Sequence, residues 1–229
     1  MSTYDFAEAC ATYRLLRERG YPEKATLKLV GDRHRLSRVQ RNCLFRGVIV
    51  EEIAARRKVK LVALQAASGQ LVALDWYNVL ITVESYLKGE TLFLADDGVV
   101  RDASATHGSY RTGALTPRAL QEIMAMITRL SPSRVEAYLD LPIAFSARMA
   151  EELRVRLAGL PCAAEVTLAP SADFPLKASA GIVASSDSAV LDGCVRAIDL
   201  ARAVLEERFG FSPPVVHDLF PESPGSPPR

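Results

Sequence analysis

The chain has 229 residues, of which 49% are hydrophobic, and carries a formal net charge of +1 at pH 7. This length and apolar content allow one sizeable core and a small additional module. The longest apolar runs, residues 71–74 and 79–83, are too short to cross a bilayer, which argues against a membrane protein. Residues 1–5 show no basic segment followed by an apolar one, so we expect no secretory signal and a cytoplasmic location.

Cysteine usage agrees with a cytoplasmic chain. The four cysteines are Cys10, Cys43, Cys162 and Cys194, and none of them belongs to a C-x-x-C pair. Such wide spacing indicates neither a disulfide framework nor a zinc site. We therefore expect reduced thiols that act as small buried side chains.

The charge is unevenly distributed along the chain. Residues 1–60 hold 14 Lys and Arg against 7 Asp and Glu, a net charge of +7, whereas residues 61–229 hold 14 against 20, a net charge of −6. This asymmetry indicates a basic module joined to an acidic one. A basic module favours polyanions through counterion release, and an acidic module that acts on polyanions needs cations to mask its carboxylates.

Three helices are expected in the basic region. Apolar residues at helical spacing predict a helix over residues 4–20, and Pro22 fits the first turn of a second helix. Ser37 begins a capping box that opens a third helix, which we expect to continue to about Arg57. We therefore interpret residues 1–58 as a small basic helical module.

Four arginines lie within residues 33–41 of this module. Arg38 and Arg41 are three residues apart and share a helix face, so we take Arg35, Arg38 and Arg41 as candidate phosphate contacts. The alternative is that these side chains are solvated or dock onto the acidic module.

From residue 59 onwards, strands alternate with helices. Apolar runs predict strands at residues 59–64, 70–74, 91–95, 135–139, 164–168 and 181–184, and helices at residues 78–87, 116–130, 146–157 and 188–209. This alternation predicts an α/β domain over residues 59–211, with a largely parallel sheet covered by helices on both faces. Residues 212–229 are rich in Pro, Ser and Gly, and we expect a disordered tail.

Four of the apolar runs end in aspartate, at Asp75, Asp96–Asp97, Asp140 and Asp187. Because parallel strands end at the same edge of a sheet, we expect a cluster of carboxylates there. Carboxylates that close together repel one another unless a cation lies between them, and their hard oxygens suit Mg²⁺ or Mn²⁺. The alternative is that an aspartate such as Asp187 only caps the helix that follows it.

Two short motifs carry a resemblance to a known superfamily. Asp75-Trp76-Tyr77-Asn78 lies at a strand-to-helix junction and resembles the D-x-x-N opening of PIN/NYN-like nucleases. Ser185-Ser186-Asp187 resembles the late S-x-D element of that superfamily, and the order of elements over residues 70–209 also fits it. The whole chain resembles an uncharacterised prokaryotic family that joins a short basic helical region to such a domain.

The resemblance implies a PIN-like three-layer sandwich preceded by the helical module. It implies that Asp75, Asp97, Asp140 and Asp187 are catalytic, with Asp75, Asp97 and Asp187 as ligands of Mg²⁺ or Mn²⁺. It further implies that Asn78 orients the first aspartate or the phosphate, and that RNA is favoured over DNA. A departure is Trp76, where the superfamily often has glycine; this ring either anchors the core or stacks on a base.

A polar loop over residues 101–111 follows Asp97 and completes the candidate site. Long polar loops in compact domains are often functional. Arg101 and Arg111 are candidate phosphate contacts and His107 a candidate proton shuttle, although a solvated surface loop is the alternative. We add Ser109 from this loop and Ser186 from the late motif as candidate substrate contacts.

Three functions remain open from the sequence. The first is a divalent-metal-dependent nuclease, and the second is a non-catalytic nucleic-acid-binding or regulatory protein on a nuclease-like scaffold. The third is a phosphatase or transferase that acts on a nucleotide or an RNA end. The sequence contains no G-x-G-x-x-G, P-loop or G-x-S-x-G motif, which removes support for dinucleotide binding, P-loop chemistry and serine hydrolysis. A homodimer is also left open.

Overall fold

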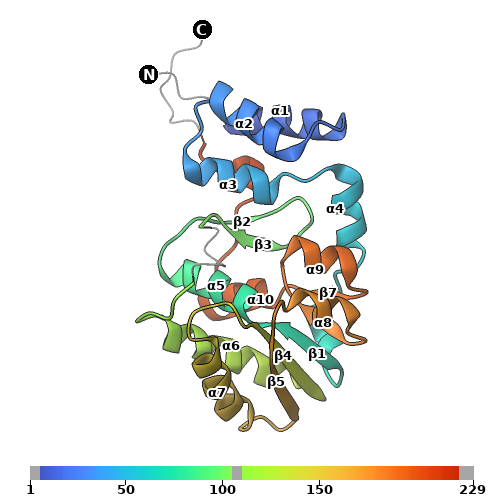
Figure 1. Ribbon diagram of the computed structural model, residues 1–229, viewed down its shortest axis with the longest axis vertical. Helices are drawn as coiled ribbons and strands as arrows, with labels where there is room; N and C mark the ends of the chain where they lie inside the picture. Colours follow the sequence, from blue (N-terminus) through green and yellow to red (C-terminus); the bar gives the residue numbers. More distant parts are fainter. Residues whose placement is uncertain (1–5, 105–109, 222–229) are drawn as a thin grey trace. The chain divides into compact units, whose positions relative to one another are not determined.

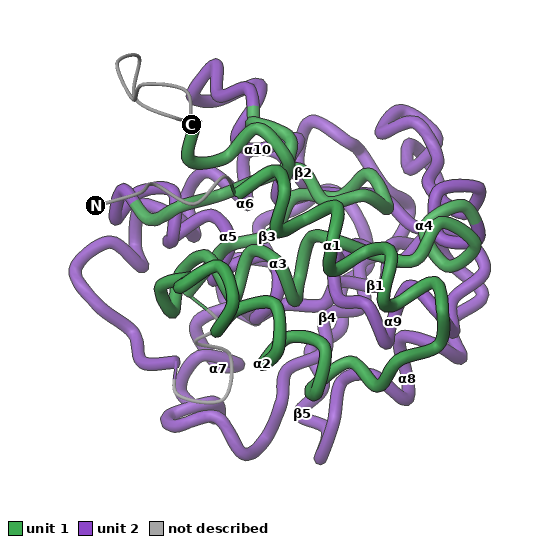
Figure 2. The backbone as a smooth tube through the Cα atoms, turned by 90° about the horizontal axis from the view of Figure 1, so that it is seen from above, with its two compact units in different colours: residues 1–55, 90–105, 213–229 green, residues 56–89, 106–212 purple. Residues whose placement is uncertain are grey.

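The computed structural model describes residues 6–104 and 110–221. The chain divides into two compact units, coloured separately in Figure 2. The first contains residues 1–55, 90–105 and 213–229, and the second contains residues 56–89 and 106–212. The sequence predicted a module of residues 1–58 alone, whereas in the structure one internal segment and the C-terminal segment also belong to the first unit.

The N-terminal helices are α1 (Phe6–Glu18), α2 (Glu23–Arg33), α3 (Arg38–Gly47) and α4 (Glu51–Lys58). Ser37 caps α3 in the expected capping box, because its hydroxyl accepts from the Gln40 N–H while the Gln40 side chain accepts from the Ser37 N–H. The long third helix that the sequence predicts is divided after Gly47. The carboxylate of Asp96 accepts a hydrogen bond from the Ile49 N–H (2.8 Å) and so stabilises the break.

A hairpin and a C-terminal segment complete the first unit. Strands β2 (Leu92–Leu94) and β3 (Val100–Asp102) pair in antiparallel fashion, and the short helix η3 (Val216–Asp218) follows an isolated bridge between Leu94 and Val215. The prediction of a disordered tail is wrong for residues 213–221, since Val216 is fully buried in the core of this unit. The strand expected at residues 91–95 exists, but it lies outside the main sheet.

The second unit contains a five-stranded sheet in which all pairings are parallel. Its order is β5-β4-β1-β6-β7. The strands are β1 (Leu71–Asp75), β4 (Arg134–Asp140), β5 (Ala163–Ala169), β6 (Ile182–Ala184) and β7 (Ala197–Ile198). The predicted parallel sheet is confirmed, but residues 59–64 do not form a strand and contribute only a bridge from Leu61 to Ala197, followed by η1 (Leu64–Ala67).

Helices cover both faces of this sheet, which makes the unit a three-layer α/β sandwich (Figure 1). Helices α5, α6 and α10 pack against one another, while α8 and α9 form a separate pair and α8 contacts β1. The helices are α5 (Trp76–Leu87), α6 (Thr116–Leu130), α7 (Ser146–Leu157), α8 (Asp173–Ala178), α9 (Ser188–Gly193) and α10 (Leu200–Phe209). Within the described ranges, no helix combines the length and the apolar character needed to span a membrane.

The long closing helix expected at residues 188–209 is interrupted. The chain leaves α9 after Gly193, pairs with β6 through β7, and begins α10 after Asp199. The Asp199 carboxylate accepts from the Arg202 N–H (2.9 Å) and caps the new helix. Periodicity alone did not separate the two helices, because the short strand between them is also apolar and buried.

Candidate functional site

The candidate site lies where the direction of strand addition in the sheet reverses, between β1 and β6. The connection after β1 leads to β4 on one side, whereas the connection after β6 leads to β7 on the other side. The carboxyl ends of β1 and β6 therefore flank a topological switch point, which is where open α/β sheets bind ligands. Asp75 ends β1, and Ser185, Ser186 and Asp187 follow β6.

Asp75 is a buried carboxylate at this point, with 4% of the residue exposed. Its Oδ2 accepts a hydrogen bond from the Ser185 hydroxyl (2.6 Å), and the same hydroxyl oxygen accepts from the Asp187 N–H (3.0 Å). Although Asp75 precedes α5, its side chain does not cap that helix. The Asp75 carboxylate is thus held toward β6, and its hydrogen bond links the ends of the two strands.

Asn78 is buried in the first turn of α5, and its side chain faces the loop that follows β6. Its Oδ1 accepts from the Ser186 N–H (2.8 Å) and from the Ser186 hydroxyl (3.0 Å). The expected contact from Asn78 to the first aspartate is therefore replaced by a contact to Ser186. Together with the Asp75–Ser185 bond, this pair fixes the turn after β6 against the start of α5.

Asp187 is half-buried and caps α9, which is the alternative that its sequence position left open. Its Oδ1 accepts from the N–H groups of Ala189 (2.8 Å) and Val190 (3.1 Å). The Oδ2 atom accepts no hydrogen bond from any residue in the described part of the chain. Capping and binding are therefore compatible, because one oxygen serves the helix and the other remains available.

Asp140 ends β4, the neighbour of β1 on the opposite side from β6. Its Oδ1 accepts from the Ala172 N–H (2.9 Å), which links the loops that follow β4 and β5. Burial raises the pKa of Tyr77 to about 12, and the negative charge of Asp140 contributes to this rise. Asp140 and Tyr77 are therefore electrostatic neighbours, a relationship that the sequence reading did not include.

Asp97 and Arg101 do not join this group. Asp97 is fully buried and Arg101 is 2% exposed, and they form a two-pronged ion pair in the first unit with both N–O distances at 2.8 Å. Arg101 also donates to the Arg46 carbonyl oxygen (3.1 Å). Because β2 belongs to a separate hairpin, its end is not at the edge of the parallel sheet. This pairing removes Asp97 from the candidate metal ligands and Arg101 from the candidate phosphate contacts.

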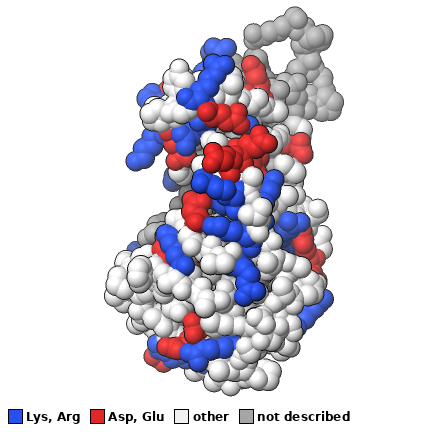
Figure 3. Space-filling model, turned by 90° about the vertical axis from the view of Figure 1, so that its right-hand side faces the viewer, with Lys and Arg blue, Asp and Glu red and all other residues white. Residues whose placement is uncertain are grey.

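The remaining predicted contacts are divided between the units. His107 and Ser109 lie outside the described residues, and the side chain of Arg111 is exposed in the second unit. In the first unit Arg35 and Arg38 are exposed, whereas Arg41 donates to the Asp32 carboxylate (2.9 Å) and the Leu36 carbonyl oxygen (3.0 Å). On the face drawn in Figure 3, basic and acidic side chains are interspersed, as such ion pairs require.

A buried polar cluster in the second unit was not anticipated from the sequence. Glu84 is 1% exposed, and its Oε1 accepts from the hydroxyls of Tyr110 (2.7 Å) and Thr116 (2.5 Å). Lys88 pairs with its other oxygen (3.0 Å). Thr116 is the first residue of α6, and its hydroxyl donates to Glu84 and accepts from the Gly113 N–H. The available signal was that Glu84 is the one charged residue of helix α5, all of which the structure describes.

The carboxylates near the switch point do not form a protein cage for a metal ion in the described part of the chain. Within residues 6–104 and 110–221, no group of three or more His, Cys, Asp or Glu residues is placed to hold a metal ion. However, Mg²⁺ usually keeps several waters and binds through one or two carboxylates plus substrate phosphate. Asp75 and the Oδ2 atom of Asp187 are carboxylate groups of that kind, on adjacent strand ends.

The fold and the site define an α/β sandwich with acidic and hydroxyl side chains at its switch point. The chain belongs to the family described as "Domain of unknown function (DUF5616)", which matches residues 64–203. Residues 5–60 match the family described as "Protein of unknown function (DUF434)". The "Uncharacterized protein MJ0935" of Methanocaldococcus jannaschii is 27% identical over 179 residues, which cover 78% of this chain and 85% of that relative. No solved structure matches the chain.

Proposed function

We propose that the second unit is a divalent-metal-dependent nuclease, with RNA favoured over DNA. The observation that carries the proposal is the buried Asp75 carboxylate, which is held by Ser185 at the switch point of the sheet. A buried carboxylate lowers the stability of a protein unless it is hydrogen-bonded or binds a cation, so its place at a ligand-binding edge favours a functional role. The D-x-x-N and S-x-D motifs of PIN/NYN-like nucleases fall on the same two strand ends, which supports this reaction class and the preference for RNA.

The residues of the chain have separate tasks in this proposal. Asp75 and Asp187 would hold Mg²⁺ or Mn²⁺, which activates water and neutralises charge on the phosphate. Ser185 fixes the position of the Asp75 carboxylate, and Asn78 fixes Ser186 so that the turn keeps its shape. Asp140, on the other side of β1, adds negative charge that favours a cation at this edge.

The test is cleavage of labelled single-stranded RNA and DNA by the full chain in Mg²⁺, in Mn²⁺ and in excess chelator. We expect metal-dependent cleavage that is lost in Asp75→Asn and strongly reduced in Asp187→Asn. A matched control is Asp173→Asn on α8, whose carboxylate pairs only with Lys177 on the exposed surface of that helix. Cleavage that persists in Asp75→Asn, or that ignores the chelator, would refute the assignment.

A second candidate is a non-catalytic nucleic-acid-binding or regulatory protein. It is favoured by the Asp97–Arg101 pair and by the use of Asp187 as a helix cap, because both reduce the number of carboxylates left for a metal. In this case binding to nucleic acid would be independent of Mg²⁺ and would weaken steeply with salt, without cleavage. For the phosphatase or transferase alternative no specific observation adds support, because its candidate residue His107 lies outside the described residues.

A further inference from the structure

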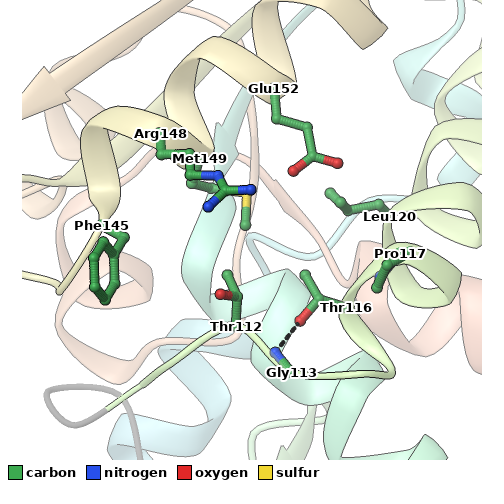
Figure 4. A pocket seen from close by; sticks show the side chains of 9 residues that line it. All are labelled: Thr112, Gly113, Thr116, Pro117, Leu120, Phe145, Arg148, Met149 and Glu152. Carbon is green, nitrogen blue, oxygen red and sulfur yellow. Dashed lines mark hydrogen bonds between the residues drawn. The ribbon is translucent and has the colours of Figure 1, made fainter.

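A cavity of about 290 Å³ lies in the second unit between the N-terminal ends of α6 and α7 (Figure 4). Its walls come from residues 112–120 on one side and from residues 145–152 on the other. Helix α7 follows β4 and α6 precedes it, so both helices begin at the carboxyl edge of the sheet, where Asp140 ends β4. The volume is close to the lower limit of roughly 300 Å³ for small-molecule sites.

The walls carry chemistry that suits a phosphate group. Arg148 points from α7 toward the space between the helices, and Thr112 faces it from the opposite side. Within the described part of the chain, Arg148 forms no hydrogen bond or ion pair. Glu152 also lines the cavity, but its carboxylate is paired with Arg156 on the same helix, which offsets its negative charge. A cation without an internal partner in the first turn of α7, at the positive end of the helix dipole, provides a complementary environment for an anion.

Phe145 gives the cavity an aromatic rim. It is 66% exposed, and it adopts a left-handed backbone conformation with a φ of 62°. An aromatic side chain gains little stability when it is exposed, and a left-handed conformation is strained for a bulky residue. Strained residues of this kind cluster at ligand sites, where a function outweighs the strain.

We propose that this cavity binds one nucleotide unit of a single-stranded nucleic acid, in which the base stacks on Phe145 and the phosphate contacts Arg148. The inference rests on the proposed nuclease function and assigns part of its substrate path, on the Asp140 side of the sheet edge. Bases in a duplex already stack on one another, so an exposed ring selects single strands. Arg148, in the first turn of α7, recognises the phosphate, which is common to RNA and DNA.

The experiment measures binding separately from cleavage. Fluorescence anisotropy of short labelled single-stranded RNA, single-stranded DNA and duplex is recorded with the full chain in excess chelator. We expect single strands to bind more tightly than duplex, and Phe145→Ala to weaken single-strand binding by roughly 5- to 100-fold, as the loss of one stacked base does. Phe145→Tyr, which keeps the ring, is expected to bind like the unchanged protein.

Arg148→Ala has its own readout. It is expected to weaken binding and to reduce the slope of log affinity against log salt by about 0.7, the value for one phosphate contact with a single strand. Two control variants remove the same side chains from places that do not line the cavity. They are Phe174→Ala on α8, where the ring is 80% exposed, and Arg129→Ala in the last turn of α6.

The outcomes separate this inference from the nuclease proposal. Binding by Phe145→Ala equal to that of the unchanged protein, or an equal loss in Phe174→Ala, overturns the cavity assignment. If Asp75→Asn still abolishes cleavage in that case, the nuclease proposal stands without it. If the unchanged protein binds none of the three probes in chelator, the cavity assignment fails, and the cleavage test in Mg²⁺ or Mn²⁺ decides the nuclease proposal separately. Thermal unfolding of each variant, expected to match that of the unchanged protein, shows whether the loss of binding is local.

Discussion

The Asp75 carboxylate and the Ser185 hydroxyl, 110 positions apart in sequence, form a 2.6 Å hydrogen bond between the ends of two adjacent parallel strands. Both residues are buried, so this bond satisfies a carboxylate that water reaches poorly. It is also the contact by which the switch point of the sheet acquires a fixed shape.

Removal of the Ser185 hydroxyl should leave Asp75 with one fewer donor. We expect Ser185→Ala to lower the free energy of unfolding by about 1–3 kcal/mol, the usual penalty for unpairing a buried polar group. Urea denaturation measures this change. The exposed Ser133 provides a control, since its side chain makes no hydrogen bond among the described residues and Ser133→Ala should be neutral. Equal stability of the two variants would show that the bond contributes nothing.

The Glu84 cluster should anchor the segment that leads into α6. Tyr110→Phe removes one of two hydroxyl donors to a buried carboxylate and should lower the free energy of unfolding by about 1–3 kcal/mol. The matched control is Tyr86→Phe on the same helix as Glu84, because Tyr86 packs on Phe209 and Phe211 through its ring. The prediction is contradicted if both tyrosine variants unfold at the same urea concentration.

The Asp97–Arg101 pair should be structural rather than catalytic. Arg101→Met leaves a buried carboxylate without its ion-pair partner and should destabilise the protein by about 3–5 kcal/mol. The double variant Asp97→Leu with Arg101→Met removes both charges and should recover much of that loss. A double-mutant cycle measures the coupling, and a cycle close to zero would contradict the importance of the pair. Because the pair is expected to be structural and not catalytic, the double variant should also retain any metal-dependent cleavage.

Acid should weaken the first unit through Asp96. Burial raises the pKa of this carboxyl, but hydrogen bonds from His217 and from the Ile49 N–H, together with the charge of Arg14, outweigh burial and lower the pKa overall. A carboxyl whose pKa is lowered on folding contributes stability above its unfolded pKa of about 3.9 and loses it as the pH falls further. The unfolded pKa of about 3.9 sets the relevant range at about pH 5 to pH 3. Over this range we expect the free energy of unfolding to fall less in Asp96→Asn than in the unchanged protein. Parallel urea titrations across this range provide the measurement, and identical pH dependence would contradict the prediction.

The sequence predicted the sheet well because its strands are short apolar runs between helices with recognisable starts. Residues 72–74 are buried on both faces, and such a run favours a parallel sheet, whereas residues 135–139 alternate between buried and half-buried side chains. The interruption of the closing helix was not predictable in this way. It depends on the pairing of β7 with β6, a contact that periodicity does not encode.

The candidate site was predicted in part. The strand-end rule correctly placed Asp75 and Asp187 at neighbouring strands, because those strands are adjacent and parallel. The same rule failed for Asp97, since β2 turns back on β3 in a hairpin and presents Arg101 to the carboxylate. Phe145 was overlooked because neither its exposure nor its positive φ can be read from residue type.

The chain order of the first unit has a consequence for biosynthesis. Val216 packs against the Gly47 backbone so closely that an added Cβ would lie 2.5 Å from its side chain, and Leu94 donates its N–H to Pro214. The N-terminal helices of this unit, translated earlier, therefore wait for residues 213–221 before their core is closed. Loss of residues 213–221, by early termination of translation or by proteolysis, would expose the apolar faces of those helices and so mark the product for degradation.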